Sequence, residues 1–447
     1  MTKGDHCETV YIAEIENHEM TSSVPSHRAS QPFLVGLVVF LFFAWGFGTV
    51  LNDTLFPKLK GLYSLTYAEG MLTQFCFFFS YFVFAIPAGL LLSKIGYIRG
   101  VVLGLCGMAL GCALFWPAAA LDRFEAFLVP LFVLAAGMTM LQVAANPFIE
   151  LLGPEKTSHS RLTLAQAFNS LATAIGPAIG AVLILRTGVS VASGGSAAAI
   201  HTQRLHETHT IGVFYLAIAA VLFLVAILFW FLRDRPAPPV PGQADFRGIV
   251  SLLNRPLLVL GACCIFIYVG AEVSIGTVMT NFLMQKNVLG LTAEHAGALV
   301  SYYWGGPMVG RFIGSYVLRI AKPGYVLAAC ALGAIVLTVL ASSTSGAVAA
   351  VSLIAVGLCN SIMFPTIFSL ASERLGAQTP NGSGLLIMAI LGGAVIPLLV
   401  GKIADASSLS AALLVPALCY IGICVYGVLA ARGLLLSEDD RAAVMAA

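Results

Sequence analysis

The chain has 447 residues, of which 59% are hydrophobic and only 10% are charged, and its formal net charge is +2. Soluble domains carry about 25% charged residues, so this composition excludes an ordinary soluble enzyme or binding domain. The small net charge gives no indication of a nucleic-acid partner. The sequence contains no nucleophile motif, phosphate-binding loop or paired catalytic carboxylates, so we expect neither an enzyme nor a cofactor.

Twelve apolar segments follow one another along the chain. A bilayer core takes about 20 residues of α-helix, and continuous apolar runs argue against the short alternating strands of a membrane barrel. The sequence therefore predicts an all-α membrane protein with twelve transmembrane helices. The predicted spans are Phe33–Leu51, Met71–Leu92, Val101–Ala120, Phe127–Leu152, Leu162–Leu185, Ile211–Leu232, Leu257–Leu283, Ala296–Leu318, Gly324–Ala341, Ala347–Leu370, Gly384–Val400 and Ala411–Ala430.

Lysine and arginine are unevenly distributed between the loops. With a cytoplasmic N-terminus, the inner loops and tails carry more than twice as many of these residues as the outer loops. Basic residues favour the cytoplasmic side, so we expect both termini in the cytoplasm. Residues 1–30 are polar and mixed in charge, unlike a cleaved signal peptide, and are predicted to form a disordered tail.

A polar, proline-rich stretch divides the chain into two related halves. Ala135–Phe148 in the fourth span resembles Ala355–Phe368 in the tenth, and Pro177 in the fifth span lies 220 residues before Pro397 in the eleventh. Duplicated halves are typical of transporters that rock around a site at the membrane midplane. The sequence predicts a tail over 1–30, a six-helix bundle over 31–232, a cytoplasmic linker over 233–255, a second six-helix bundle over 256–430 and a tail over 431–447.

Two carboxylates lie at predicted membrane depth, where ionisable residues are expensive and are functional candidates. Asp53 precedes Pro57 near the end of the first span, and Glu272 lies halfway along the seventh. Desolvation favours the protonated form of Asp53, which suits a proton carrier. The alternative is a hydrated carboxylate paired with Lys58. We expect Glu272 to accept a hydrogen bond from a sugar hydroxyl, to carry a proton, or both.

Amide side chains supply both donors and acceptors, as sugar hydroxyls require. Gln142 and Asn146 are four residues apart and Gln166 and Asn169 are three apart, so each pair shares one helix face. These four residues, together with Asn281 and Asn360, are the predicted sugar ligands, and hydrogen bonding between helices is the alternative. Arg311, at the inner end of the eighth span, is predicted to act as a gate, and a brace for a loop is the alternative. Candidate aromatic contacts for a sugar ring are Trp45, Phe77, Tyr81, Tyr302, Tyr303 and Trp304.

Three histidines lie between the fifth and sixth spans. His201, His206 and His209 fall in the segment 187–210, which we expect to be an irregular outer loop. Their spacing does not form an ordered set of metal ligands, so we expect no metal site.

Several stretches resemble those of one transporter family. They are LNDTLFPKL (Leu51–Leu59), ALFWPAA (Ala113–Ala119), LQVAANPFIELLGPE (Leu141–Glu155), RLTLAQAFNSL (Arg161–Leu171), EVSIG (Glu272–Gly276), FPTIFSLA (Phe364–Ala371) and GSGLLIMAILGGAVIPLLVG (Gly382–Gly401). The chain resembles the major facilitator superfamily, and within it the fucose–galactose–glucose:proton symporters, where it is similar to bacterial glucose/galactose transporters and more distantly to fucose permease. The resemblance implies proton-driven import of a hexose by alternating access. It also implies a multi-pass protein of the bacterial inner membrane, and we expect a functional monomer.

One position departs from fucose permease. That transporter has two membrane carboxylates linked to proton movement; Asp53 occupies the position of the first, whereas Gln142 stands at the second. The resemblance thus implies that Asp53 is the principal proton carrier. Two alternatives stay open: an efflux antiporter, because Gly176–Gly180 resembles a motif of drug antiporters, and a membrane sugar sensor that does not transport.

Overall fold

The computed structural model describes residues 32–63, 67–180, 197–233 and 246–435. Within these ranges it describes only the backbone of residues 48–58, 60–61, 67–72, 176–180, 197–201, 203, 246–247 and 293–294. The described residues form helices joined by short turns, as the composition predicts.

The first half of the chain contributes α2 (Pro32–Tyr63), α3 (Tyr67–Ile95), α4 (Tyr97–Ala120), η1 (Phe124–Phe127), α5 (Leu128–Leu151), η2 (Glu155–Thr157), α6 (Ser158–Gly180) and α7 (Ala197–Phe231). The second half contributes α9 (Pro256–Met284), α10 (Ala293–Ile320), α11 (Pro323–Ser343), α12 (Gly346–Asn360), α13 (Met363–Ser372), η4 (Gly376–Gln378), α14 (Thr379–Met388), η5 (Ala389–Leu391), α15 (Gly392–Ala406), α16 (Leu409–Ala412) and α17 (Leu414–Ala431). The short helix α8 (Phe246–Leu252) lies between the two halves in the sequence.

Nine helical segments within the described ranges are long and apolar enough to cross a membrane, and Pro32–Phe47 of α2 is a shorter apolar helix. Neither α6 nor α10 is among the nine. Both carry buried polar side chains, including Gln166 and Ser170 on α6 and Arg311 and Ser315 on α10. These two helices pack against each other across the two halves, so their polar residues face protein rather than lipid.

Three of the predicted spans are not continuous helices. The tenth is divided into α12 and α13, the eleventh into α14 and α15, and the twelfth into α16 and α17. Pro365 and Pro416 follow two of the breaks, and a proline removes one backbone donor and clashes with the carbonyl four residues earlier. At the third break, Gly392 lets α15 approach α9, because a Cβ there would lie 1.8 Å from the Phe266 carbonyl oxygen.

Two segments expected to be irregular contain helix. The predicted outer loop 187–210 is helical from Ala197 onward, where it forms the first turns of α7. Its His209 is exposed and its ring lies 4.9 Å from that of Trp116. The predicted linker 233–255 contains α8. The apolar pattern of the predicted sixth span starts at Ile211, later than α7 itself. The sequence therefore predicts a loop where the polar first turns of α7 lie.

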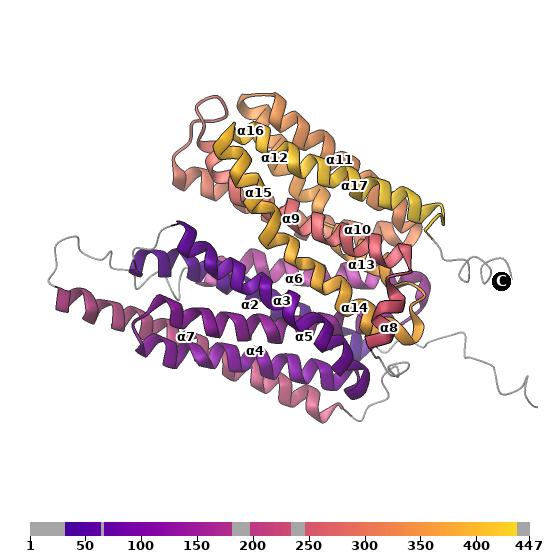
Figure 1. The fold of residues 1–447 in the computed structure, drawn as a ribbon, viewed down its shortest axis with the longest axis horizontal. Helices are drawn as coiled ribbons and strands as arrows, with labels where there is room; N and C mark the ends of the chain where they lie inside the picture. Colours follow the sequence, from indigo (N-terminus) through magenta and orange to yellow (C-terminus); the bar gives the residue numbers. More distant parts are fainter. Residues whose placement is uncertain (1–31, 64–66, 181–196, 234–245, 436–447) are drawn as a thin grey trace, which may run out of the picture.

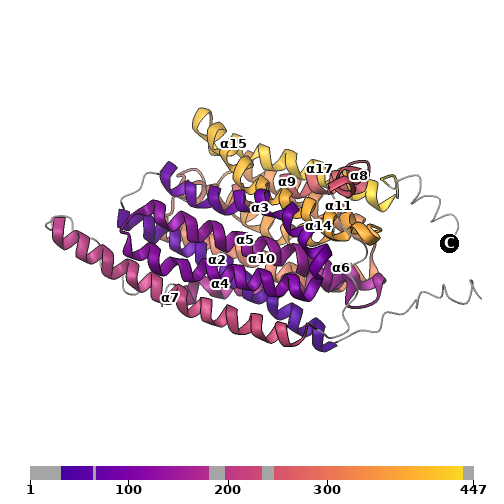
Figure 2. The same ribbon diagram turned by 60° about the horizontal axis from the view of Figure 1, so that its bottom comes forward.

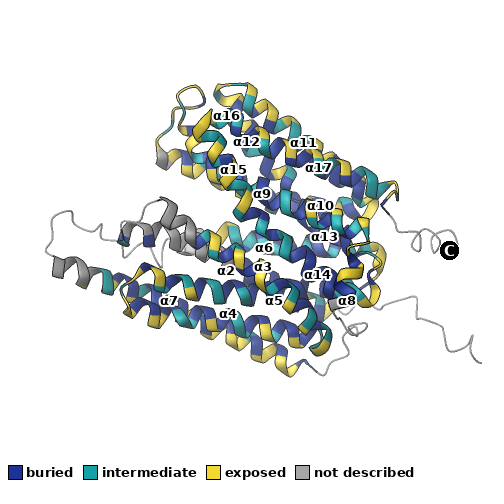
Figure 3. Ribbon diagram, in the orientation of Figure 1, coloured by how far each residue is buried: buried dark blue, intermediate teal, exposed yellow. Residues whose placement is uncertain are grey.

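The two halves lie side by side as two groups of helices (Figure 1). The start of α2, the end of α7, α8 and the end of α17 share one end of the molecule in both views (Figures 1 and 2). The groups meet at that end through α3 with α14 and α6 with α10, contacts that we call the seam. Buried residues concentrate where helices meet, and exposed residues cover the outer faces of α4, α7, α11 and α17 (Figure 3).

Candidate functional site

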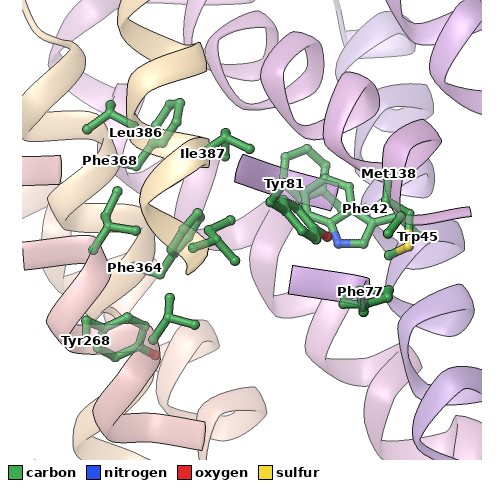
Figure 4. Close-up of a cluster of buried hydrophobic side chains, with 14 of the residues drawn as sticks. Phe42, Trp45, Phe77, Tyr81, Met138, Tyr268, Phe364, Phe368, Leu386 and Ile387 are labelled. Carbon is green, nitrogen blue, oxygen red and sulfur yellow. The ribbon is translucent and has the colours of Figure 1, made fainter. Parts of the chain in front are cut away.

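In the first half, a buried amide lies among aromatic rings. The Gln142 Nε2 atom donates to the Tyr81 hydroxyl at 2.8 Å, and both side chains are buried. Tyr81 lies 5.6 Å from the ring of Phe77, and Trp45 lies 4.4 Å from the ring of Phe42. Figure 4 shows these rings on the helices of the first half, with Tyr268, Phe364 and Phe368 on the helices of the second. An amide and a phenol among buried aromatic rings can bind hydroxyls and the apolar face of a sugar.

The other amides of the first half are used in different ways. The Asn169 Nδ2 atom donates to the Phe42 carbonyl at 2.9 Å. This close approach requires glycine at residue 46, because a Cβ there would lie 2.6 Å from the same Nδ2 atom. Asn169 therefore joins α6 to α2 and keeps its oxygen for another partner. The Asn146 side chain is fully buried, and neither of its amide atoms has a hydrogen-bond partner among the described residues.

In the second half, Glu272 lies in a network with two tyrosines, of which Tyr303 was an expected aromatic contact and Tyr268 was not. The Tyr268 hydroxyl donates to the Asn360 carbonyl at 3.1 Å, and the Asn360 Nδ2 atom donates to the Tyr303 hydroxyl at 3.1 Å. Tyr303 in turn donates to the backbone carbonyl of Glu272 at 2.8 Å. The Glu272 carboxylate interacts with the Tyr268 hydroxyl and with the charge of Arg311. The signal for Tyr268 was present, since it lies four residues before Glu272 on the same helix face.

Arg311 connects this network to the first half. Its Nε atom donates to the Ser361 carbonyl at 2.9 Å, and its Nη1 atom donates to the Gln166 carbonyl at 3.1 Å and to the Ser170 hydroxyl. The Ser361 carbonyl lacks its usual helical donor because Pro365, four residues later, has no N–H. The proline thus leaves a buried acceptor that a charged donor on α10 satisfies.

In the fourth span, a second carbonyl freed by a proline accepts a hydrogen bond from the other half of the chain. Pro147 removes the donor for the Val143 carbonyl, and the buried Ser383 hydroxyl of α14 donates to that carbonyl at 2.9 Å. Close backbone approach at Gly384 makes this contact possible, because a Cβ there would lie 2.8 Å from the Ala85 carbonyl oxygen of α3. A carbonyl freed by a proline in one half therefore binds a side chain of the other half.

Polar side chains at the end of the molecule complete the seam. The His159 Nε2 atom lies 2.9 Å from Glu373 Oε1, and the Ser372 hydroxyl donates to Glu150 Oε2 at 3.1 Å. The Ser160 hydroxyl donates to the Ser315 carbonyl at 2.6 Å and accepts from Arg319 Nε at 3.1 Å. Each pair joins a residue of the first half to one of the second, so the halves are closed at this end.

The structure brings some of the predicted ligands together and leaves others apart. Glu272, Asn360 and Arg311 form one network, which reaches Gln166 through its backbone carbonyl. Asn281 is exposed and lies nine residues beyond Glu272 on α9, about 13 Å along the helix. Asp53 belongs to α2, and its side chain lies outside the described residues. The described part of the chain holds no group of three histidine, cysteine or acidic side chains arranged for a metal ion.

Comparisons with known proteins agree with this architecture. The model of the Major Facilitator Superfamily matches residues 33–389. A glucose/galactose transporter of Brucella abortus is 45% identical over 93% of this chain and 97% of its own length. A putative glucose/galactose transporter of Helicobacter pylori is 42% identical, covering 89% of this chain and 96% of its own length.

A second group of relatives transports a different sugar. The L-fucose-proton symporter of Escherichia coli is 36% identical over 87% of this chain and 91% of its own length. The crystal structure of the transporter FucP in the outward conformation has a TM-score of 0.82 and 34% identity, covering 89% of this chain and 98% of that one. The family match over residues 33–389 includes α5 and α9, the helices that carry Gln142 and Glu272. The chain is a multi-pass membrane protein and belongs to the Major Facilitator Superfamily.

Proposed function

We propose that this protein imports a hexose, glucose or galactose, together with a proton. The observation that carries the proposal is the placement of two buried polar groups, Gln142 with Tyr81 and Glu272 with Asn360, on the two halves of a chain closely related to glucose/galactose transporters. Sugar hydroxyls both donate and accept, so they suit amides, phenols and a carboxylate together.

The proposed sugar ligands divide between the halves. Gln142, Gln166 and the oxygen of Asn169 serve from the first half, and Glu272 and Asn360 from the second. Asn146, whose buried amide has no partner in the described residues, is an additional candidate. Asn281 lies further along α9 and would meet the sugar during entry. A ligand held from both halves favours their closure around it, which is the basis of alternating access.

Asp53 is the proposed proton carrier, because Gln142 does not titrate and a neutral carboxyl passes through the membrane core more readily than a charged one. Glu272 is the second proposed proton site. Support for proton coupling comes from the relation to the L-fucose-proton symporter, which covers most of both chains.

The proposed orientation places both termini and the seam in the cytoplasm of a bacterial inner membrane, with bundles over 31–232 and 256–430 and a single chain as the working unit. The halves close at that end, so this conformation would face outward. Cysteines introduced at Ile200 and Asp245 test the orientation, because a membrane-impermeant reagent should label the first from outside and the second only after permeabilisation. Labelling of both from outside would contradict it.

The decisive functional test is uptake by the purified transporter in proteoliposomes. Labelled glucose or galactose should accumulate when the outside is acidic, and a protonophore should abolish the accumulation. A sodium gradient at equal pH is the control. Accumulation driven by sodium alone would refute proton coupling. Extrusion of sugar or drug against the gradient would favour the antiporter, and sugar binding without transport would favour the sensor.

A further inference from the structure

A cavity of about 440 Å³ lies at the seam, away from the proposed sugar site. Its walls come from the turn 155–159 of the first half and from the segments 318–323 and 373–374 of the second. A cavity of this volume is large enough for a small metabolite. Its two sides belong to different halves, so it exists in this form only while the seam is closed.

Cationic side chains outnumber acidic ones in the lining. Lys156 comes from the first half, and Arg319, Lys322 and Arg374 come from the second. The acidic residues of the lining are Glu155 and Glu373. The Glu373 Oε1 atom lies 2.9 Å from His159 Nε2, so this carboxylate already has a partner at the edge of the cavity. The cavity therefore has an excess of positive charge, which comes from the second half, while Lys156 and Glu155 of the first half offset each other.

We propose that this cavity binds a phosphate group, carried by a phosphate monoester of about hexose size or by a lipid headgroup. A phosphate carries up to two negative charges and several acceptor oxygens, which match the two lysines and two arginines of the lining better than a single carboxylate does. Basic pockets between transmembrane helices are also known to bind phosphate-bearing headgroups.

Binding at this place has a consequence for the transport cycle. A ligand that contacts both halves binds the closed seam better than the open one, and it stabilises the closed conformation by mass action. The phosphate compound would thus slow the opening of this end and act as an inhibitor. Galactose occupies the proposed sugar site in the test below, and that step rests on the proposed function, whereas the matched variants of the cavity decide the result without the uptake experiment.

Glucose 6-phosphate is the probe for the soluble source. The purified transporter in detergent, saturated with galactose so that the sugar site is occupied, should show a melting temperature that rises with probe concentration and then saturates. Glucose at the same concentrations and sodium chloride at matched ionic strength should not reproduce the rise.

A pair of matched double variants locates the site. Lys156→Gln with Lys322→Gln removes one charge from each side of the cavity and should raise the half-maximal probe concentration about tenfold, as expected for lost charged hydrogen bonds. The control combines Lys94→Gln with Lys402→Gln, two exposed lysines that do not line the cavity, and should respond like the wild type.

The lipid source is tested in nanodiscs of phosphatidylcholine with and without phosphatidylglycerol. Stabilisation by phosphatidylglycerol that is lost in the cavity variant, without an effect of glucose 6-phosphate, assigns the phosphate to a lipid headgroup. The proposal is overturned if neither source stabilises the wild type, or if the cavity and control variants respond equally.

Discussion

Removal of the Ser383 hydroxyl should open the seam. Ser383 is fully buried on α14 and donates to the Val143 carbonyl of the other half at 2.9 Å. Pro147 leaves that carbonyl without a helical donor. Ser383→Ala therefore leaves the buried Val143 carbonyl without a donor in the closed conformation. In the open conformation water reaches the carbonyl, so the substitution has little effect there.

The size of the effect follows from the cost of a buried acceptor without a donor. Such a loss is about 1–3 kcal/mol in protein interiors, while hydrogen bonds between membrane helices average about 0.6 kcal/mol and reach about 1.7. We expect a value of about 1–2 kcal/mol, since the proline removes the alternative donor. The equilibrium should shift toward the conformation open at this end by roughly 5- to 30-fold.

Alkylation of a cysteine at residue 163 reports this equilibrium. Thr163 is fully buried at the seam, opposite Gly314 of α10, and its hydroxyl has no partner among the described residues, so Thr163→Cys removes no hydrogen bond that the structure shows. The rate of alkylation by a small maleimide should rise about 5- to 30-fold when Ser383→Ala is added. The background from the native cysteines is measured without Thr163→Cys.

Ser342→Ala is the matched control, because the Ser342 hydroxyl donates to the Ser410 carbonyl at 2.7 Å within the second half. It removes a similar bond without touching the seam and should leave the alkylation rate unchanged. Equal rates in the Ser383→Ala and Ser342→Ala backgrounds would refute the argument that the carbonyl freed by Pro147 holds the halves together.

Three further substitutions test the proposed transport site. Arg311→Lys keeps the charge but loses the fork of donors that reaches three partners, so uptake should fall at least about tenfold; wild-type uptake would show that charge alone suffices. Glu272→Gln should nearly abolish hexose uptake while leaving the melting temperature close to that of the wild type, because glutamine keeps an acceptor for the Tyr268 hydroxyl and Tyr303 donates to the backbone carbonyl; unchanged uptake would assign Glu272 a structural role. Asp53→Asn should abolish accumulation against a gradient but preserve sugar exchange between two filled sides, and accumulation by this variant would place the proton carrier elsewhere.

The sequence alone determined that the chain lies in a lipid bilayer and that its fold is all-α. Runs of about 20 apolar residues leave few alternatives to transmembrane helices, because the bilayer cannot satisfy free backbone groups. The two membrane carboxylates and the spacing of Gln142 and Asn146 were visible for the same reason, since polar residues stand out in apolar runs. The positions of the helix breaks were less visible, as they depend on how prolines and glycines such as Gly392 meet neighbouring helices.

Only the tertiary structure decided which polar groups are partners. Arg311 lies far from Ser361 and Gln166 in the sequence, and Ser383 lies 240 residues from Val143. A sequence shows that Pro147 and Pro365 each free a carbonyl, but it does not show which side chain will satisfy it, because that depends on the packing of one half against the other. The closure of the seam and the cavity within it arise from the same packing, and periodicity within a single helix carries no information about either.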